Sequence, residues 1–172
     1  MTTTTATATM NISILASGSS GNSLYIESDK KKILVDAGLS GKKITALLAE
    51  VGRKPEDLDA ILVTHEHRDH IHGVGVMARK YKLDVYANEK TWEAMDPLIG
   101  NVPVEQKQIF DMGKVLTLGD LDIESFGVSH DAAAPQFYSF HKDGKKFVML
   151  TDTGYCSEHV RGVIRDADAY LM

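Results

Sequence analysis

Cysteine is nearly absent from this chain. Its single cysteine, Cys156, cannot form an internal disulfide, which excludes a disulfide-stabilised scaffold and suits a reducing cytoplasm. Long hydrophobic runs are also absent, so no membrane-spanning segment is expected. The formal net charge of −5 provides no general attraction to nucleic acid or anionic lipid. Bound divalent ions would still make a site locally positive, so a phosphate substrate is neither supported nor excluded.

The remaining composition is that of an ordinary folded domain. The chain has 172 residues, 43% of them hydrophobic and 25% charged, which is enough for one well-buried core. Residues 1–9 are almost entirely threonine and alanine, without the basic region and apolar stretch of a secretory signal. We therefore expect a low-complexity extension over residues 1–9 and one domain over residues 10–172, beginning at Met10.

Hydrophobic periodicity predicts several strands, followed by helices between strands. A helix is expected over residues 44–51, with Ser40 as its N-cap and Gly52 after its end. The apolar run 60–63 is typical of a central strand buried on both faces. The other expected strands are 11–16, 24–27, 33–35, 84–86, 114–118, 121–126, 136–141, 145–150 and 169–172, and the other expected helices are 73–81, 89–95 and one containing 160–164. This alternation indicates the α/β class.

The densest group of potential metal ligands is the run 65–70, HEHRDH. In extended backbone, residues two apart point the same way, so His65 and His67 can face one ion. Asp69 and His70 follow where the chain turns into a helical pattern, and we expect them to face a neighbouring point. The spacing therefore predicts a two-metal hydrolase site, the alternative being a solvated polar loop. These ligand types suit zinc, manganese and other transition metals and do not choose among them.

Two further potential ligands follow predicted strands. His130 comes after the strand 121–126, and Asp152 comes after the strand 145–150. If these strands lie side by side, all the candidates gather at one edge of the sheet assembly, where α/β proteins commonly build sites. A surface-loop histidine and a turn aspartate are the alternatives.

Two other features are candidates for supporting roles. Asp36 directly follows a predicted strand and could hydrogen-bond a metal ligand or its loop, although a turn aspartate is an alternative. The small-residue loop before the second predicted strand could present backbone N–H groups to a phosphate, although a tight turn is an alternative. Its candidates for substrate binding are Ser19, Ser20, Gly21 and Asn22.

Several runs together resemble one known family. The run 63–73, VTHEHRDHIHG, is similar to the His-x-His-x-Asp-His signature of the metallo-β-lactamase superfamily. Ser129-His130 and the run 151–154, TDTG, resemble the next two ligand motifs of that family, in the same order. The run 16–23, ASGSSGNS, resembles the opening of its YycJ/WalJ-like subgroup. The resemblance extends from Met10 to the end of the chain.

The resemblance implies an αββα sandwich and a metal-dependent hydrolase. Two divalent ions, zinc or manganese, are expected as cofactors. The implied ligands are His65, His67 and His130 for one ion, Asp69 and His70 for the second, and Asp152 as a bridge between them. In this subgroup the implied reaction is hydrolysis of DNA phosphodiesters from a 5′ end.

Two-metal chemistry suggests a second role for Asp69. A pair of ions about 3.5 to 4 Å apart lowers the pKa of a shared water and stabilises charge on the substrate oxygens. Asp69 is placed to orient the resulting hydroxide or to accept its proton. We therefore expect Asp69 to be catalytic as well as a ligand.

The chain departs from the family pattern at its end. The pattern places a last histidine ligand after a further strand, and no candidate occurs before Met172. His159 lies in a predicted helix and is expected on the surface. The sequence therefore resembles the N-terminal portion of the sandwich, and we expect the second metal site to be weakened or incomplete.

Three functions are compatible with these observations. The leading one is a phosphodiesterase or 5′-exonuclease acting on DNA. The second is a hydrolase of a small ester, thioester or lactam. The third is a mono-iron dioxygenase acting on a thiol or persulfide, because the same ligand types can hold iron. Activity on DNA that falls steeply with salt would favour the first function, and iron with oxygen-dependent turnover would favour the third.

Overall fold

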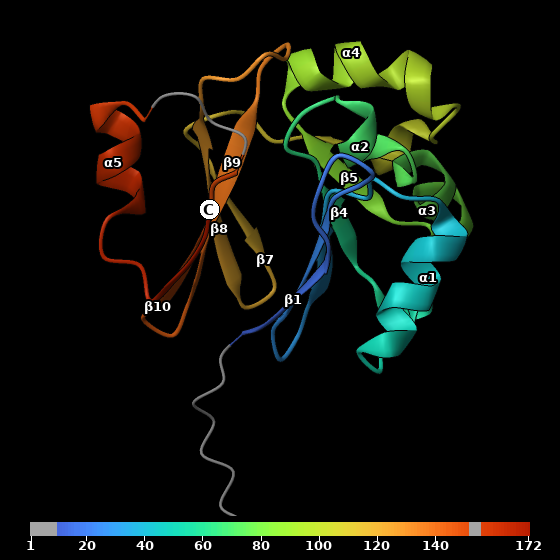
Figure 1. Cartoon of the computed structure of the whole chain (residues 1–172), viewed down its shortest axis with the longest axis horizontal. Helices are drawn as coiled ribbons and strands as arrows, with labels where there is room; N and C mark the ends of the chain where they lie inside the picture. The colour runs from blue at the N-terminus through green and yellow to red at the C-terminus, as the bar shows by residue number, and fades with distance from the viewer. Residues whose placement is uncertain (1–9, 152–155) are drawn as a thin grey trace, which may run out of the picture.

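The computed structural model describes residues 10–151 and 156–172 of the chain. Within these residues, two β-sheets lie face to face, with helices on the outer side of each sheet (Figure 1). The αββα arrangement that the resemblance implies is therefore confirmed.

The first sheet has its strands in the order β1-β2-β3-β4-β5-β6. Their bounds are β1 Asn11–Ala16, β2 Ser23–Glu27, β3 Lys32–Val35, β4 Ala60–Leu62, β5 Asp84–Ala87 and β6 Lys107–Ile109. Strands β1 to β3 pair antiparallel and β3 to β6 pair parallel, so β3, β4 and β5 end on the same side of the sheet. The periodicity does not predict β6, because this edge strand reads Lys-Gln-Ile and carries little apolar signal.

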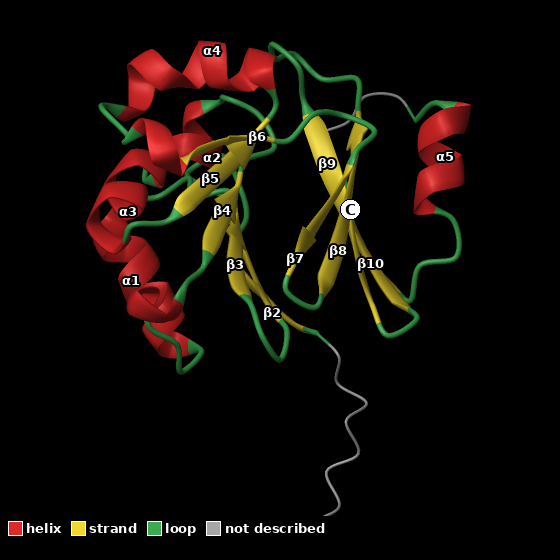
Figure 2. Cartoon of the chain, turned by 180° about the vertical axis from the view of Figure 1, so that it is seen from behind, coloured by secondary structure: helices red, strands yellow, loops and turns green. Residues whose placement is uncertain are grey.

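Helices lie on the outer side of the first sheet (Figure 2). Their bounds are α1 Gly41–Glu50, α2 Arg68–Ile71, α3 Val74–Tyr81 and α4 Glu89–Ile99, with short 3-10 turns η1 Pro55–Asp57 and η2 Val104–Gln106. Ser40 caps α1, as predicted, by accepting a hydrogen bond from the Lys43 backbone N–H. Gly52 follows α1 with a positive φ of 73°, as its predicted position requires. In the described part of the chain, no helix is long and apolar enough to cross a membrane.

The second sheet has the order β11-β10-β9-β8-β7. Its strands are β7 Val115–Leu118, β8 Leu121–Gly127, β9 Gln136–Lys142, β10 Lys145–Met149 and β11 Ala169–Leu171. The consecutive strands β7 and β8 pair antiparallel, and so do β9 and β10. Helix α5, Glu158–Ile164, lies on the outer side of this sheet and precedes β11, which pairs parallel with β10.

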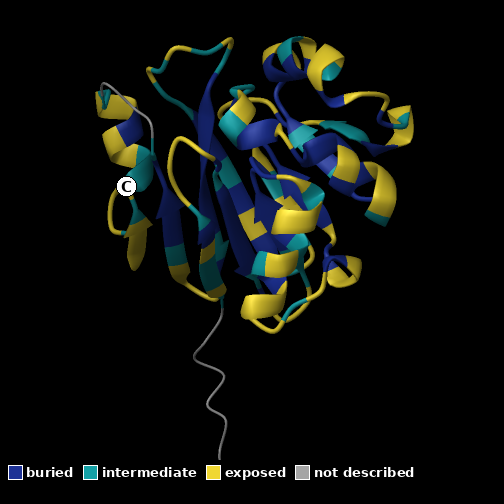
Figure 3. Cartoon of the chain, turned by 45° about the vertical axis from the view of Figure 1, so that its right-hand side comes forward, coloured by how far each residue is buried: buried dark blue, intermediate teal, exposed yellow. Residues whose placement is uncertain are grey.

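The central strands are buried on both faces (Figure 3). Successive side chains of a strand point to opposite faces. Leu34 and Ile61 therefore join the core beneath the helices, whereas Ile33 and Leu62 join the core between the sheets. Phenylalanine side chains of the second sheet, such as Phe140, fill that inner core. The prediction that the run 60–63 is buried on both faces is confirmed.

The loop after β4 contacts the start of β9 across the two sheets. The Tyr138 hydroxyl donates to the Val63 carbonyl oxygen at 2.6 Å, and the Gln136 backbone N–H donates to the Thr64 carbonyl oxygen at 3.0 Å. The strands leading to the histidine run and to His130 are not neighbours, because β4 and β8 belong to different sheets. The candidate residues therefore meet between the sheets.

Candidate metal centre

The histidine run changes from extended to helical backbone at His67. Strand β4 ends at Leu62, His67 has φ −61° and ψ 140°, and α2 begins at Arg68. His67 therefore lies in extended backbone, whereas Asp69 and His70 lie in the helical turn that begins directly after it. This is the local conformation that the spacing predicts.

Three histidines from the two sheets form a cluster, which we call the three-histidine cluster: His65, His67 and His130. One ring nitrogen of each lies within 4.8 Å of the others. The ring centroids of His65 and His67 are 4.7 Å apart, and those of His65 and His130 are 4.8 Å apart. His65 is buried and the other two are half-buried. The fold thus brings together the three residues that the resemblance assigns to the first ion.

The nitrogen atoms of the cluster fit a metal ion. The Nε2 atoms of His65 and His130 are buried and have no hydrogen-bond partner among the described residues. Such atoms are rare in folded proteins and call for a partner, such as an ion. Burial lowers the pKa of His65 to about 4, so its ring is neutral at pH 7 and offers a lone pair. Three imidazoles are a donor set that suits zinc.

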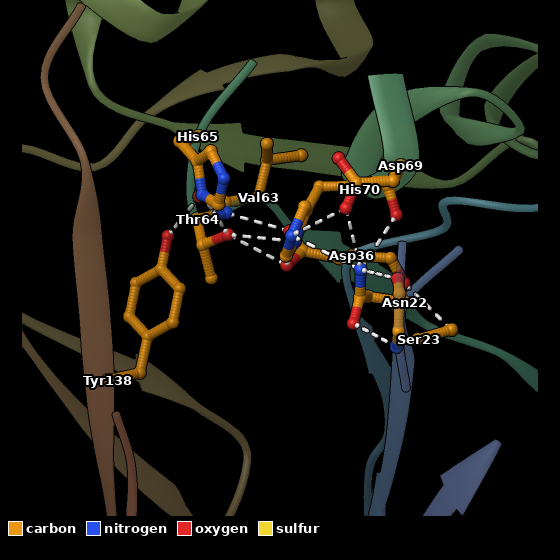
Figure 4. Close-up of polar contacts among 10 residues, drawn as sticks. Asn22, Ser23, Asp36, Val63, Thr64, His65, Asp69, His70 and Tyr138 are labelled. Atoms are coloured by element: carbon orange, nitrogen blue, oxygen red, sulfur yellow. Dashed lines mark hydrogen bonds and ion pairs between the residues drawn. The ribbon is translucent and has the colours of Figure 1, made fainter. Parts of the chain in front are cut away.

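Asp36 is the centre of the hydrogen bonds behind these ligands (Figure 4). It is completely buried and has a left-handed backbone with φ 64°. One carboxylate oxygen accepts the Thr64 backbone N–H at 2.8 Å. The other oxygen lies 2.7 Å from the Thr64 hydroxyl and 2.7 Å from His70 Nδ1. Asp36 therefore contacts both a candidate ligand and the loop that carries the others.

This network assigns the protons of two histidines. An ionised carboxylate only accepts hydrogen bonds, so His70 carries a proton on Nδ1 and turns its Nε2 away from Asp36. The Thr64 hydroxyl donates to Asp36 and so accepts from His65 Nδ1, which lies 2.9 Å away. His65 therefore carries its proton on Nδ1, which leaves its lone pair on Nε2. Sequence reasoning missed Thr64, because a lone threonine after a strand carries no distinctive signal.

Asn22 connects the small-residue loop to the second pair of candidate ligands. Its Nδ2 atom lies 3.1 Å from Asp69 Oδ2 and 3.3 Å from His70 Nε2. Its backbone N–H donates to the Asp69 carbonyl oxygen at 2.7 Å. Asp69 Oδ2 lies 3.6 Å from His70 Nε2, and the rings of His65 and His70 have centroids 4.1 Å apart. The second pair of candidate ligands therefore adjoins the three-histidine cluster.

The small-residue loop uses several of its own hydrogen-bond donors. The Gly18 N–H donates to Asn22 Oδ1 and the Gly21 N–H donates to the Gly18 carbonyl oxygen. Together with the Asn22 backbone N–H, these donors are engaged within the protein. Ser19 and Ser20 remain exposed. They line an open hollow of about 400 Å³ together with Gly38, Arg68, Asp69 and His72.

Two glycines let distant loops approach α2 closely. A Cβ atom on Gly38 would lie 1.7 Å from the Asp69 carbonyl oxygen, and one on Gly73 would lie 2.1 Å from the Leu39 carbonyl oxygen. Any side chain at these positions would displace backbone. The sequence does not reveal this requirement, because the contacts join segments that are far apart in the chain.

Two remaining predictions concern residues near the end of the chain. Asp152, the expected bridging ligand, lies outside the described residues. His159 is exposed on α5, as predicted.

Comparisons with known proteins agree with this geometry. The family model described as a beta-lactamase superfamily domain matches residues 31–172. The chain is 70% identical over 162 residues to the exodeoxyribonuclease WalJ of Streptococcus pneumoniae, covering 93% of this chain and 60% of that protein. It is 58% identical over 163 residues to the exodeoxyribonuclease YycJ of Bacillus anthracis, covering 95% of this chain and 62% of that protein. The chain thus spans about three fifths of the length of these curated relatives.

A solved structure shows the same fold. The metallo-beta-lactamase fold protein YhfI of Bacillus subtilis superposes with a TM-score of 0.75 at 19% sequence identity, covering 94% of this chain and 70% of that one. At this identity the likeness concerns the fold alone.

Proposed function

The chain belongs to the metallo-β-lactamase superfamily, and we propose that it forms the catalytic part of a metal-dependent exodeoxyribonuclease acting from the 5′ end of DNA. The observation that carries the proposal is the three-histidine cluster, in which two buried ring nitrogens lack a hydrogen-bond partner among the described residues. The names of the two exodeoxyribonuclease relatives support DNA as the substrate. A cytoplasmic location is part of the proposal, supported by the single cysteine.

Two divalent ions, zinc or manganese, are the proposed cofactors. The three-histidine cluster would hold one ion, Asp69 and His70 would hold the second, and Asp152 would bridge them. When bound, such ions supply Lewis acidity, which lowers the pKa of water and stabilises charge on phosphoryl oxygens. The hydrogen bond from His70 Nδ1 to Asp36 supports this assignment, because it leaves Nε2 of His70 facing Asp69.

Asp69 is the proposed catalytic carboxylate. Its Oδ2 atom lies 3.1 Å from the side-chain amide of Asn22, which holds the carboxylate in one orientation. In that orientation Asp69 can direct the attacking water and accept its proton. Asn22 therefore supports Asp69 and is unlike the exposed Ser19 and Ser20, which are free to meet a substrate.

The hollow beside Asp69 is the proposed approach for the DNA backbone. Arg68, His72, Ser19 and Ser20 line it with a guanidinium, an imidazole and two hydroxyls, all groups that can donate hydrogen bonds to phosphate oxygens. The net charge of −5 offers no general attraction to DNA, so such local donors matter for binding.

The test follows degradation of DNA that carries a label at its 5′ or its 3′ end. We expect manganese- or zinc-dependent release of the 5′ label, abolished by a chelator and restored by the metal. His67→Ala and Asp69→Asn should each reduce the rate about 100-fold or more, since loss of a ligand exceeds the effect of losing its supporting residue. His159→Ala removes an exposed histidine from α5 and is the matched control.

Other outcomes would replace this proposal. Turnover of small esters or thioesters that does not depend on salt, without DNA cleavage, would favour the small-molecule hydrolase. One iron per chain with oxygen-dependent consumption of a thiol or persulfide would favour the dioxygenase. Cleavage that persists in His67→Ala would place the activity outside this site.

A further inference from the structure

The loop that carries His130 is attached to the histidine run by a side chain that is not a candidate ligand. The backbone N–H of Ala133 donates to both carboxylate oxygens of Glu66, at 2.8 and 3.1 Å. Glu66 lies in the loop after β4 of the first sheet and thus binds the loop between β8 and β9 of the second sheet. Neither the two-metal interpretation nor the proposed function assigns a role to this residue.

Glu66 stands between two histidines whose rings belong to the same cluster. His65 and His67 point towards the three-histidine cluster, and alternation directs the intervening side chain to the other side of the chain. From there Glu66 reaches past the cluster to Ala133, three residues beyond His130. The two loops are therefore linked twice if an ion is bound, once through the histidines and once through the Glu66 carboxylate.

Other contacts hold the far end of the same loop. The side-chain amide of Asn88 donates to the Ala134 carbonyl oxygen at 2.7 Å, and the Val128 N–H donates to the Pro135 carbonyl oxygen at 3.2 Å. Within the loop, the Ala132 N–H donates to the His130 carbonyl oxygen at 3.0 Å. A hydrogen bond that fixes the position of Ala133 therefore also restrains the backbone of His130, because one short turn connects the two residues.

We propose that Glu66 is a positioning residue, which holds the loop of His130 in place before metal binds and so raises the affinity of the three-histidine cluster for its ion. Ordering the loop in advance reduces the conformational entropy that binding would otherwise remove. The inference rests on the three-histidine cluster as a metal site and does not depend on DNA as the substrate.

Three variants of the whole chain separate the possible roles of Glu66. Glu66→Ala removes both the charge and the acceptor. Glu66→Gln removes the charge but keeps one oxygen, which is enough for the single N–H of Ala133. Glu56→Ala is the matched control, because it removes an exposed carboxylate from η1, ahead of the amino-terminal end of β4.

The measurements are zinc affinity by calorimetric titration and hydrogen exchange of the Ala133 amide by NMR in metal-free protein. For Glu66→Ala we expect about tenfold weaker zinc binding, the low end of the effect of losing a supporting residue, since the hydrogen bond is exposed to solvent. The Ala133 amide should exchange faster in the same variant. Glu66→Gln and Glu56→Ala should have the zinc affinity and the Ala133 exchange rate of the wild-type protein.

Three results would overturn the proposal. The first is unchanged zinc affinity and unchanged exchange in Glu66→Ala. The second is a loss in Glu66→Gln equal to that in Glu66→Ala, which would assign the effect to charge. The third is slower DNA hydrolysis in Glu66→Ala with zinc binding intact, which would place Glu66 at the substrate. Because zinc binding and exchange are measured without DNA, failure of the nuclease proposal would leave these results interpretable.

Discussion

Replacing Asp36 with asparagine should reverse the protons on two histidines at once. In the native network one oxygen of Asp36 accepts the Thr64 N–H, so the asparagine oxygen must take that place. The new NH₂ group then faces the Thr64 hydroxyl and His70 Nδ1, both 2.7 Å from the native oxygen. His70 must accept at Nδ1 and carry its proton on Nε2. The Thr64 hydroxyl then accepts from the amide and donates to Nδ1 of His65. His65 must therefore also carry its proton on Nε2.

The expected loss of zinc affinity follows from the new position of the proton on each ring. A ring that carries its proton on Nε2 offers no lone pair there, so metal binding must first restore the native arrangement. We expect Asp36→Asn to weaken zinc binding about 10- to 100-fold, which is about 1.4 to 2.7 kcal/mol. The protein itself should lose about 1.5 to 3 kcal/mol of folding stability, because buried hydrogen bonds to a charged group are weakened.

The assay is calorimetric zinc titration, with circular dichroism to establish that the variant is folded. Asp57→Asn makes the same chemical change on an exposed residue of η1 and should leave zinc affinity unchanged. If folded Asp36→Asn binds zinc within about twofold of the unchanged protein, the assignment of protons by Asp36 is refuted.

Three other predictions concern stability. Gly38→Ala should cost about 3 kcal/mol in chemical denaturation, because its Cβ would lie 1.7 Å from the backbone oxygen of Asp69. Tyr138→Phe should cost about 1 to 3 kcal/mol in the same assay, because it removes a completely buried hydroxyl and the hydrogen bond that this hydroxyl donates to the Val63 carbonyl oxygen. The hydrogen bond from Arg53 lowers the pKa of Glu27 from 4.5 to about 2, so its contribution is complete above pH 4.5 and is lost as pH falls towards 2. Glu27→Gln should therefore flatten the dependence of stability on pH across this window.

Each of these predictions has a contrary result. If Gly38→Ala had native stability, the loop that carries Gly38 would be able to move away from Asp69 without loss of stability. Equal stability of Tyr138→Phe would mean that the bond between the second sheet and the loop after β4 contributes nothing net. A pH profile of Glu27→Gln that parallels the unchanged protein between pH 4.5 and 2 would assign the acid sensitivity to other carboxylates.

Most of the fold follows from local patterns. The strands and helices predicted from periodicity are present, because burial on one or both faces leaves a repeat of two or of 3.6 residues in the sequence. Strand β6 escapes prediction because it lies at the edge of the sheet, where few side chains are buried. The pairing of strands is not recorded in local patterns, so the periodicity does not show that β4 and β8 belong to different sheets.

The sequence by itself determined which candidate ligands are present and that extended backbone at His67 is followed by the helical turn of Asp69 and His70, because local conformation depends on near neighbours. Only the tertiary structure decided that His130 joins them across two sheets and that Asp36 orients the ring of His70 directly and that of His65 through Thr64. The bonds from Asp36 to Thr64 and from Asn22 to Asp69 join residues 28 and 47 positions apart. Contacts at such separations depend on how the sheets and loops pack, and no local repeat in the sequence records that packing.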